Sequence, residues 1–202
     1  MALTAAQQTD AYRFFSIAFN AAPGVEYMNQ IADAYATGAT TKQVVNAFVS
    51  KSQFTNVYPT FLTNEAFASN LVENVVGSSA AAAAKTQAKA DIVTALNGGL
   101  TRGDVIYTIF NNLAAKPAAD ADWGATAKMM ANKVAVAQYY TEVLLGNTTN
   151  LATLQSVLSN VTPATDVSTP AAIQAVLGDV FSAQGQAFTL TANSDQVPGM
   201  NG

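Results

Sequence analysis

Residues 4–20, TAAQQTDAYRFFSIAFN, indicate the fold class of this chain. This stretch opens with Thr4-x-x-Gln7, a pattern in which the two side chains cap the backbone at the start of a helix. Apolar residues then recur at helical spacing and share one face, namely Ala11, Phe14, Phe15, Ala18 and Phe19. The stretch therefore predicts an amphipathic helix whose buried side is strongly aromatic.

The helical period continues along the chain to about residue 183. We expect further helices over residues 25–37, 40–49, 64–76, 80–97, 101–115, 121–145, 151–160 and 170–183. The helix over residues 121–145 is the longest of these, and residues 54–62 are expected to form a short turn region around Pro59. Thr169-Pro170 has the residue types favoured at the N-cap and first position of the last helix. The predicted fold class is all-α, a multi-helix bundle or an array of helix-turn-helix repeats.

Two segments of the chain resemble each other. Residues 38–49, GATTKQVVNAFV, align with residues 99–110, GLTRGDVIYTIF. In both, a Gly that can end a helix is followed two residues later by a Thr that can cap the next one, and paired apolar residues come at the same offsets. Two such segments fit either a duplication or the residue pattern that unrelated helix-turn-helix units commonly share.

The pattern of apolar and polar residues changes near residue 185. We predict one helical domain over residues 1–185, with repeat-like sub-units over 1–62 and 63–115 and a long-helix part over 116–185. Residues 188–191, FTLT, alternate apolar and polar side chains as a strand does. Residues 186–202 are therefore expected to form a short β or loop tail that begins a β-rich, calcium-binding region.

Charge and composition exclude several classes of protein. The chain has no Cys and no His, which excludes disulfides, thiolate catalysis, Ser-His-Asp triads and His-based zinc sites. The net charge is −4, and all nine basic residues lie at or before Lys133. Without a basic patch, nucleic-acid binding is not expected. No window is long and apolar enough for a membrane span, so membrane insertion is not expected either.

Residues 12–58 carry a pattern found in a known family. The pattern consists of Tyr12-Arg-Phe-Phe, Ala22-Pro-Gly-Val25, Tyr27, Gly38-x-Thr-Thr41, Val44-Val45, Phe48 and Ser52-Gln-Phe54. It resembles the DUF4214-type helical repeats of secreted bacterial proteins, although the family's usual Trp is absent and Met28 follows Tyr27 instead. The end of the chain, residues 188–195, resembles the start of the calcium-binding β-roll regions in surface-layer (S-layer) proteins and adhesins exported by type I secretion.

This resemblance, which extends to surface-layer proteins of the Caulobacter type, implies a function. It implies a secreted structural protein of the bacterial cell surface, whose helical N-terminal domain holds a lattice to lipopolysaccharide or O-polysaccharide. Calcium would be needed by the full-length protein, with Asn193 and Asp195 as possible ligands, and no cofactor is expected within the helical domain. The first ten residues lack a Sec signal peptide pattern, which fits either a cytosolic protein or export through a C-terminal signal, and the resemblance implies the second.

A polysaccharide site needs an aromatic face for the sugar ring and amides or carboxylates for its hydroxyls. Trp123, the only Trp, follows Asp120 and Asp122 and the Lys116-Pro117 linker, so these side chains form a candidate cluster together with Tyr139. A purely structural role is the alternative: Trp123 would fill a helix junction, and the two Asp side chains would favour a helix N-terminus. Of Tyr139 and Tyr140, one is expected in the core and the other at its rim.

Three functions compete on this basis. The first is a surface anchor that binds glycan, and the second is a self-assembly module whose helices pack against copies of itself. The third, a carbohydrate-active enzyme, needs a pair of carboxylates. No such pair is marked in the sequence, because the thirteen acids are scattered singly, so enzymatic activity is not expected. Arg102-Gly-Asp104 spells an adhesion tripeptide, but its position predicts that Asp104 caps a helix.

Overall fold

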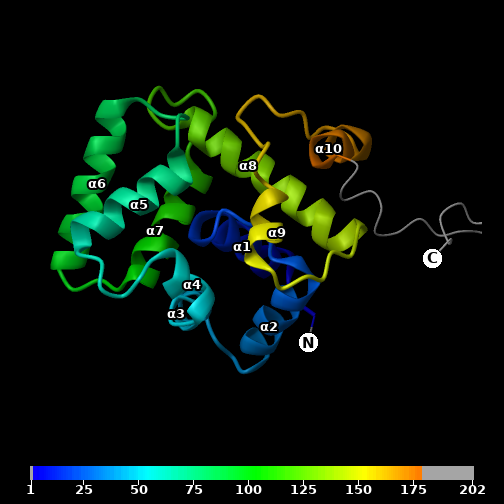
Figure 1. Cartoon of the computed structure of the whole chain (residues 1–202), viewed down its shortest axis with the longest axis horizontal. Helices are drawn as coiled ribbons and strands as arrows, with labels where there is room; N and C mark the ends of the chain where they lie inside the picture. The colour runs from blue at the N-terminus through cyan, green and yellow to red at the C-terminus, as the bar shows by residue number, and fades with distance from the viewer. Residues whose placement is uncertain (1, 179–202) are drawn as a thin grey trace, which may run out of the picture.

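The computed structural model describes residues 2–178, and all regular structure in that range is helical (Figure 1). The α-helices are α1 (Ala5–Ala18), α2 (Gly24–Ala36), α3 (Thr41–Phe48), α4 (Ser52–Val57), α5 (Asn64–Val76), α6 (Ala82–Asn97), α7 (Arg102–Ala115), α8 (Gly124–Gln138), α9 (Leu151–Ser156) and α10 (Pro170–Leu177). A π-helix, η1 (Tyr139–Val143), continues α8. The all-α prediction is confirmed. The predicted β tail lies outside the described residues.

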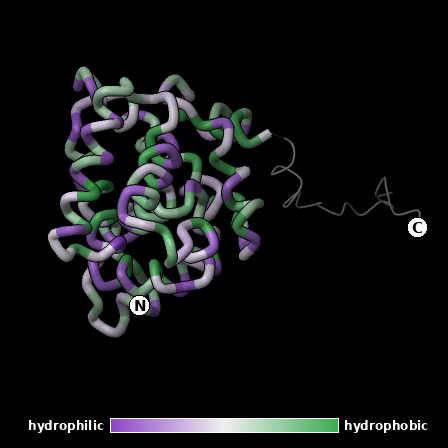
Figure 2. Tube along the Cα trace, turned by 60° about the vertical axis from the view of Figure 1, so that its left-hand side comes forward, coloured by the Kyte–Doolittle hydropathy of each residue, from purple (hydrophilic) through white to green (hydrophobic). Residues whose placement is uncertain are grey.

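Helix α1 is the centre of the molecule. It packs against α3, α5, α7 and α8. Every residue from Ala11 to Ala18 except Arg13 is buried, and the rings of Phe14 and Phe15 contact that of Phe48 edge to face. Figure 2 shows hydrophilic stretches along the outer edges of the fold, with hydrophobic segments between them. The aromatic face predicted for residues 4–20 thus organises the core.

Three predicted helix starts, at Thr4, Thr40 and Thr101, are confirmed in atomic detail. Thr4, Thr40 and Thr101 each accept a hydrogen bond from the backbone N–H three residues on, and Gln7, Gln43 and Asp104 bond back to the backbone of these threonines. Each box satisfies two backbone donors that would otherwise lack a partner inside the helix. Asp104 is therefore a capping residue, as its position in the tripeptide predicted.

The two similar segments pack against each other as α3 and α7. The Asn46 side chain donates from Nδ2 to Asp104 Oδ1 at 2.9 Å and accepts at Oδ1 from Thr101 Oγ1 at 2.7 Å. Gly103 makes room for it, since a Cβ there would lie 2.5 Å from Asn46 Oδ1. Lys42 Nζ adds an ion pair to Asp104 at 3.2 Å. One repeat-like unit therefore closes on the capped start of the other.

Arg102 joins the loop between α4 and α5 to α7. Its guanidinium donates to the carbonyl oxygens of Tyr58, Pro59 and Leu62 at 2.8–3.3 Å and lies 4.6 Å from the centre of the Phe67 ring. These carbonyls belong to the C-cap of α4 and to the loop that follows it, where a cation is a favourable partner. The guanidinium of Arg102 in the tripeptide is thus bound within the protein.

The last third of the chain folds back over α1 and α2. Backbone N–H groups of Ala22 and Val25 donate to the carbonyls of Leu154 and Gly146, at 3.1 and 2.8 Å. Asn132, buried on α8, donates through Nδ2 to the carbonyls of Thr162 and Thr165 and so holds the loop that precedes α10. Within residues 2–178, no helix combines the length and hydropathy needed to cross a bilayer.

The boundaries of four predicted segments were wrong. Residues 52–57 form helix α4 instead of a turn, because burial of Phe54 against Tyr58 and Phe67 stabilises a helical conformation there. The helix predicted over 121–145 starts only at Gly124 and becomes a π-helix at Tyr139, so α6, with 16 residues, is the longest α-helix described. Helix α9 ends at Ser156, short of residue 160. Helix α10 ends at Leu177, since Gly178 adopts a left-handed φ of 70° that terminates it.

Lys133 is a buried cation without an acidic partner. Its side chain sits on α8 with the residue 5% exposed, and its Nζ donates to Asn20 Oδ1 at 2.7 Å. No carboxylate of the described residues lies within 4.0 Å of it, and burial lowers the pKa of Lys133 to about 8. An amine whose pKa falls on folding is destabilising wherever it must carry its charge.

Replacing Arg102 with Lys should lower the free energy of unfolding by roughly 1–3 kcal/mol, because an ammonium cannot reach three carbonyls and cover the Phe67 ring at once. Urea denaturation monitored by circular dichroism measures this. The control is Arg13→Lys, since Arg13 makes only a surface ion pair with Asp10, at 3.3 Å. That change should stay within about 0.5 kcal/mol. Equal effects of the two substitutions would rule out the role given to Arg102.

Stability should rise with pH between about pH 8 and pH 10, by up to ~1.4 kcal/mol per unit, because the unfolded state holds the Lys133 proton more tightly than the folded state. Above pH 10 the buried Tyr58, whose pKa burial raises to about 12, reverses the trend. Lys133→Met should be more stable than the parent at pH 7, and its stability should not rise between about pH 8 and pH 10. A parallel pH dependence in parent and variant would contradict this assignment.

Candidate functional site

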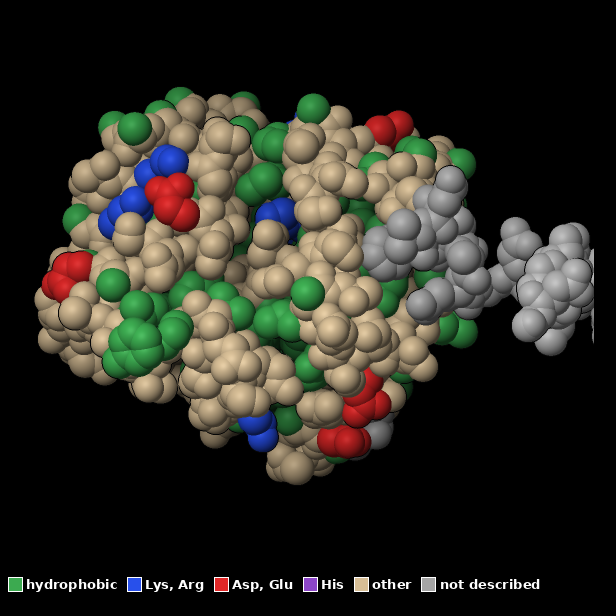
Figure 3. All heavy atoms as spheres, viewed as in Figure 1, with side chains coloured by type: hydrophobic (Ala, Val, Ile, Leu, Met, Phe, Trp, Pro, Cys, Tyr) green, Lys and Arg blue, Asp and Glu red, His purple; other side chains and the backbone are tan. Residues whose placement is uncertain are grey.

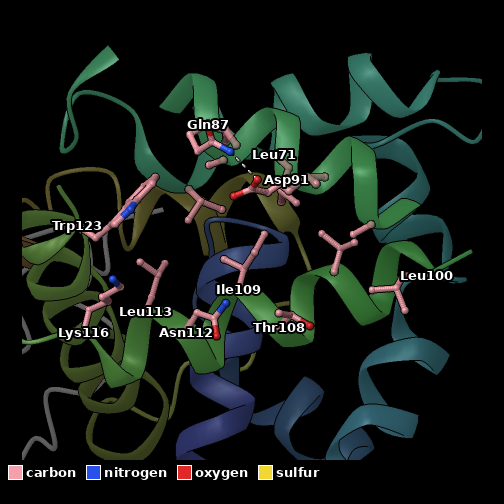
Figure 4. A pocket seen from close by; sticks show the side chains of 16 residues that line it. Leu71, Gln87, Asp91, Leu100, Thr108, Ile109, Asn112, Leu113, Lys116 and Trp123 are labelled. Carbon is pink, nitrogen blue, oxygen red and sulfur yellow. Dashed lines mark hydrogen bonds between the residues drawn. The ribbon is translucent and has the colours of Figure 1, made fainter. Parts of the chain in front are cut away.

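A groove of about 260 Å³ runs between α6 and α7 over the side of α5. In Figure 4, Trp123 and Lys116 stand at one end and Leu100 at the other. Gln87 and Asp91 of α6 form one wall, and α7 supplies the opposite one. The floor consists of apolar side chains: Leu71, Val72, Val75, Ile92, Val105, Ile109 and Leu113.

Polar side chains border this apolar floor in two pairs. Each pair is spaced four residues apart, Gln87 with Asp91 on α6 and Thr108 with Asn112 on α7, so the two members of a pair lie on the same helix face. Gln87 Nε2 donates to Asp91 Oδ1 at 2.7 Å. The groove thus offers amide, hydroxyl and carboxylate groups around an apolar surface with an indole at its end.

Asp120 holds the turn that presents Trp123. Its Oδ1 accepts the backbone N–H groups of Trp123 at 2.8 Å and Asp122 at 3.1 Å, while its Oδ2 pairs with Lys116 Nζ at 3.1 Å. The hydrogen bond from Trp123, followed by the contact with Lys116, keeps the pKa of Asp120 below its usual range. Gly124 is required here, because a Cβ would lie 2.4 Å from the Ala118 carbonyl oxygen.

The structure brings part of the predicted cluster together. Lys116 and Trp123 line the groove, and Asp120 bonds to the Lys116 ammonium and the Trp123 backbone N–H. Asp122 is exposed beside the turn and does not line the groove. Tyr139 lies at the opposite end of α8, roughly 24 Å along the helix at 1.5 Å per residue, so it belongs to a different region. Asn193 and Asp195 lie outside the described residues.

The structural role considered for Trp123 is also present. Its side chain is half-buried and packs against the core, while part of it faces the groove. The expectation for the adjacent tyrosines is confirmed, since Tyr140 is buried and Tyr139 is only partly so. Trp123 therefore fills a helix junction and forms a groove wall with the same ring.

Four groove residues were missed from the sequence: Gln87, Asp91, Thr108 and Asn112. Taken singly, they look like the solvated faces of two ordinary helices. The spacing of four residues within each pair places its two members on one helix face. That spacing indicates a shared site only when α6 and α7 are known to face each other. Among the residues that the structure describes, no cluster of acidic side chains could hold a metal ion.

No family model matches this sequence, and no curated protein or solved structure is significantly similar to it. The resemblance to DUF4214-type repeats therefore stays a prediction. The groove is the feature from which a function can be argued.

Asp120→Ala should loosen the turn that presents Trp123, because two backbone N–H groups lose their acceptor and Lys116 loses its partner. Since Trp123 is the only Trp, its fluorescence reports the change directly. We expect a red-shifted emission and easier quenching by iodide. Asp122→Ala removes the same charge from an exposed carboxylate and should leave the emission unchanged. Equal spectra for both variants would mean that Asp120 does not position the indole.

Proposed function

We propose that this chain is a non-enzymatic module that holds a secreted protein on the bacterial cell surface by binding a surface polysaccharide, such as the O-polysaccharide of lipopolysaccharide. The observation that carries the proposal is the groove with an indole at one end, an apolar floor and polar side chains along both walls. Sugar rings have apolar C–H faces and hydroxyl edges, and the groove provides a matching surface for each.

The walls of the groove suit hydroxyl recognition. Gln87 and Asn112 offer amides that can donate and accept at once, Thr108 adds a hydroxyl, and Asp91 accepts strongly. Trp123 and the exposed Leu100 bound its two ends. A groove of about 260 Å³ is at the small end of ligand sites, so it suits a short piece of a polymer.

Weak binding at each site is compatible with anchoring. Many copies of a module attached to one lattice multiply their individual affinities. The face seen in Figure 3 carries few charged side chains and consists mostly of uncharged polar groups and backbone, which suits contact with a hydrated glycan layer. Secretion by a type I route, an S-layer setting and calcium in the full-length protein belong to the proposal through the family resemblance.

Self-assembly without glycan is the second candidate, and exposed apolar side chains favour it. Phe61, in the loop between α4 and α5, is 84% exposed, and Val143 and Leu145 at the end of η1 are 59% and 66% exposed. Large aromatic side chains that are this exposed often serve as contact points in protein interfaces. The two candidates therefore depend on different residues.

Co-sedimentation with smooth and rough lipopolysaccharide, with and without calcium, tests the glycan proposal. We expect pelleting with the smooth form, and we expect Trp123→Ala to weaken binding roughly tenfold, since an aromatic contact contributes about 1–1.5 kcal/mol. Phe61→Ala is the matched control and should bind like the parent. Circular dichroism checks that both variants remain helical.

Analytical ultracentrifugation of the same two variants separates the candidates. Self-association that is lost in Phe61→Ala and kept in Trp123→Ala, together with no pelleting by either lipopolysaccharide, would replace the anchor with an assembly module. Unchanged glycan binding by a folded Trp123→Ala would remove the groove from the site.

A further inference from the structure

A second hollow, of about 350 Å³, lies between α1, the end of α7 and the first half of α8. Three of the nine basic residues line it, one from each direction: Arg13 of α1, Lys116 after α7 and Lys128 of α8. None of the described residues that line it is acidic. The hollow therefore gathers a third of the basic residues of a chain whose net charge is −4.

The six other basic side chains are placed apart from this hollow. Lys42, Lys85 and Lys89 pair with acids, Arg102 binds carbonyls, Lys133 is buried against Asn20, and Lys51 is exposed at the N-cap of α4. Of the three basic residues that line the hollow, Arg13 pairs with Asp10 and Lys116 pairs with Asp120. Lys128 has no carboxylate within 4.0 Å among the described residues.

The walls of the hollow strengthen any charge interaction inside it. Leu113 and Met130 are buried and Val134 is partly buried, so they form an apolar floor, and four alanines, at positions 114, 118, 127 and 131, leave space above it. An anion there is shielded from water on one side, which makes its attraction to the surrounding cations stronger than on an open surface.

We propose that this hollow binds a phosphate group carried by the surface saccharide. A phosphate group has three oxygens that accept strongly, so it can bind basic side chains contributed by several segments, and Arg13, Lys116 and Lys128 come from three of them. Lys116 and Leu113 line both the hollow and the groove, so a phosphate in one and a sugar ring in the other can belong to a single phosphorylated sugar unit. This inference rests on the proposed function for the sugar and names the chemical class of its ligand.

The test uses three small probes: inorganic phosphate, glucose and glucose 1-phosphate. Amide chemical shifts of the whole chain, recorded by NMR during titration, locate each probe. We expect phosphate to shift residues around Arg13, Lys116 and Lys128, and glucose 1-phosphate to shift these together with the Trp123 indole and to bind at least tenfold more tightly than glucose.

Two variants with the same charge change provide the control. Lys128→Gln should weaken phosphate and glucose 1-phosphate binding roughly tenfold, as expected for one lost charged hydrogen bond. Lys51→Gln removes an equally exposed lysine elsewhere and should bind like the parent. Equal affinities of the two variants, or phosphate shifts outside the hollow, would overturn the inference.

The outcomes also separate this inference from the proposed function. If phosphate binds the hollow while neither glucose 1-phosphate nor lipopolysaccharide reaches Trp123, the phosphate site stands and the glycan anchor fails. If smooth lipopolysaccharide is bound equally by the parent and by Lys128→Gln, and phosphate shifts nothing, the anchor stands and the phosphate site fails.

Discussion

Burial of the aromatic face of α1 holds the surrounding helices together. Four other helices pack against α1, and the rings of Phe14, Phe15 and Phe19 link its C-terminal half to α3 and α4. Apart from Ser16, whose hydroxyl has no hydrogen-bond partner among the described residues, the side chains that α1 buries are apolar or aromatic. The candidate site lies at the periphery, in the groove between α6 and α7.

Local chemistry explains why so much of the fold could be predicted from the sequence. The boxes at Thr4, Thr40 and Thr101 are decided within four residues, so the pattern alone places those helix starts correctly. Helix α4 was missed because its stability comes from Phe54 packing against distant rings. The π-helix after Gln138 was also missed; in the structure it is followed by a close approach of Gly146 to the Tyr140 ring.

The candidate site could be predicted only in part, and distance in space explains the difference. Lys116, Asp120 and Trp123 lie within eight residues of one another, so a single turn brings them together. The polar walls of the groove come from two helices whose mutual orientation is a property of the whole core. Tyr139 was grouped with Trp123 by residue type, but α8 separates them by its full length.

The pairing of α3 with α7 limits how this architecture can grow. In an open solenoid, each repeat leaves a free face for the next one, so copies can be added without end. Here the amide of Asn46 occupies the capped start of α7, and Gly103 lies too close to it for another helix to enter. The contact between the two units therefore leaves this face closed to a further copy. An extended array built from this protein must use its other surfaces.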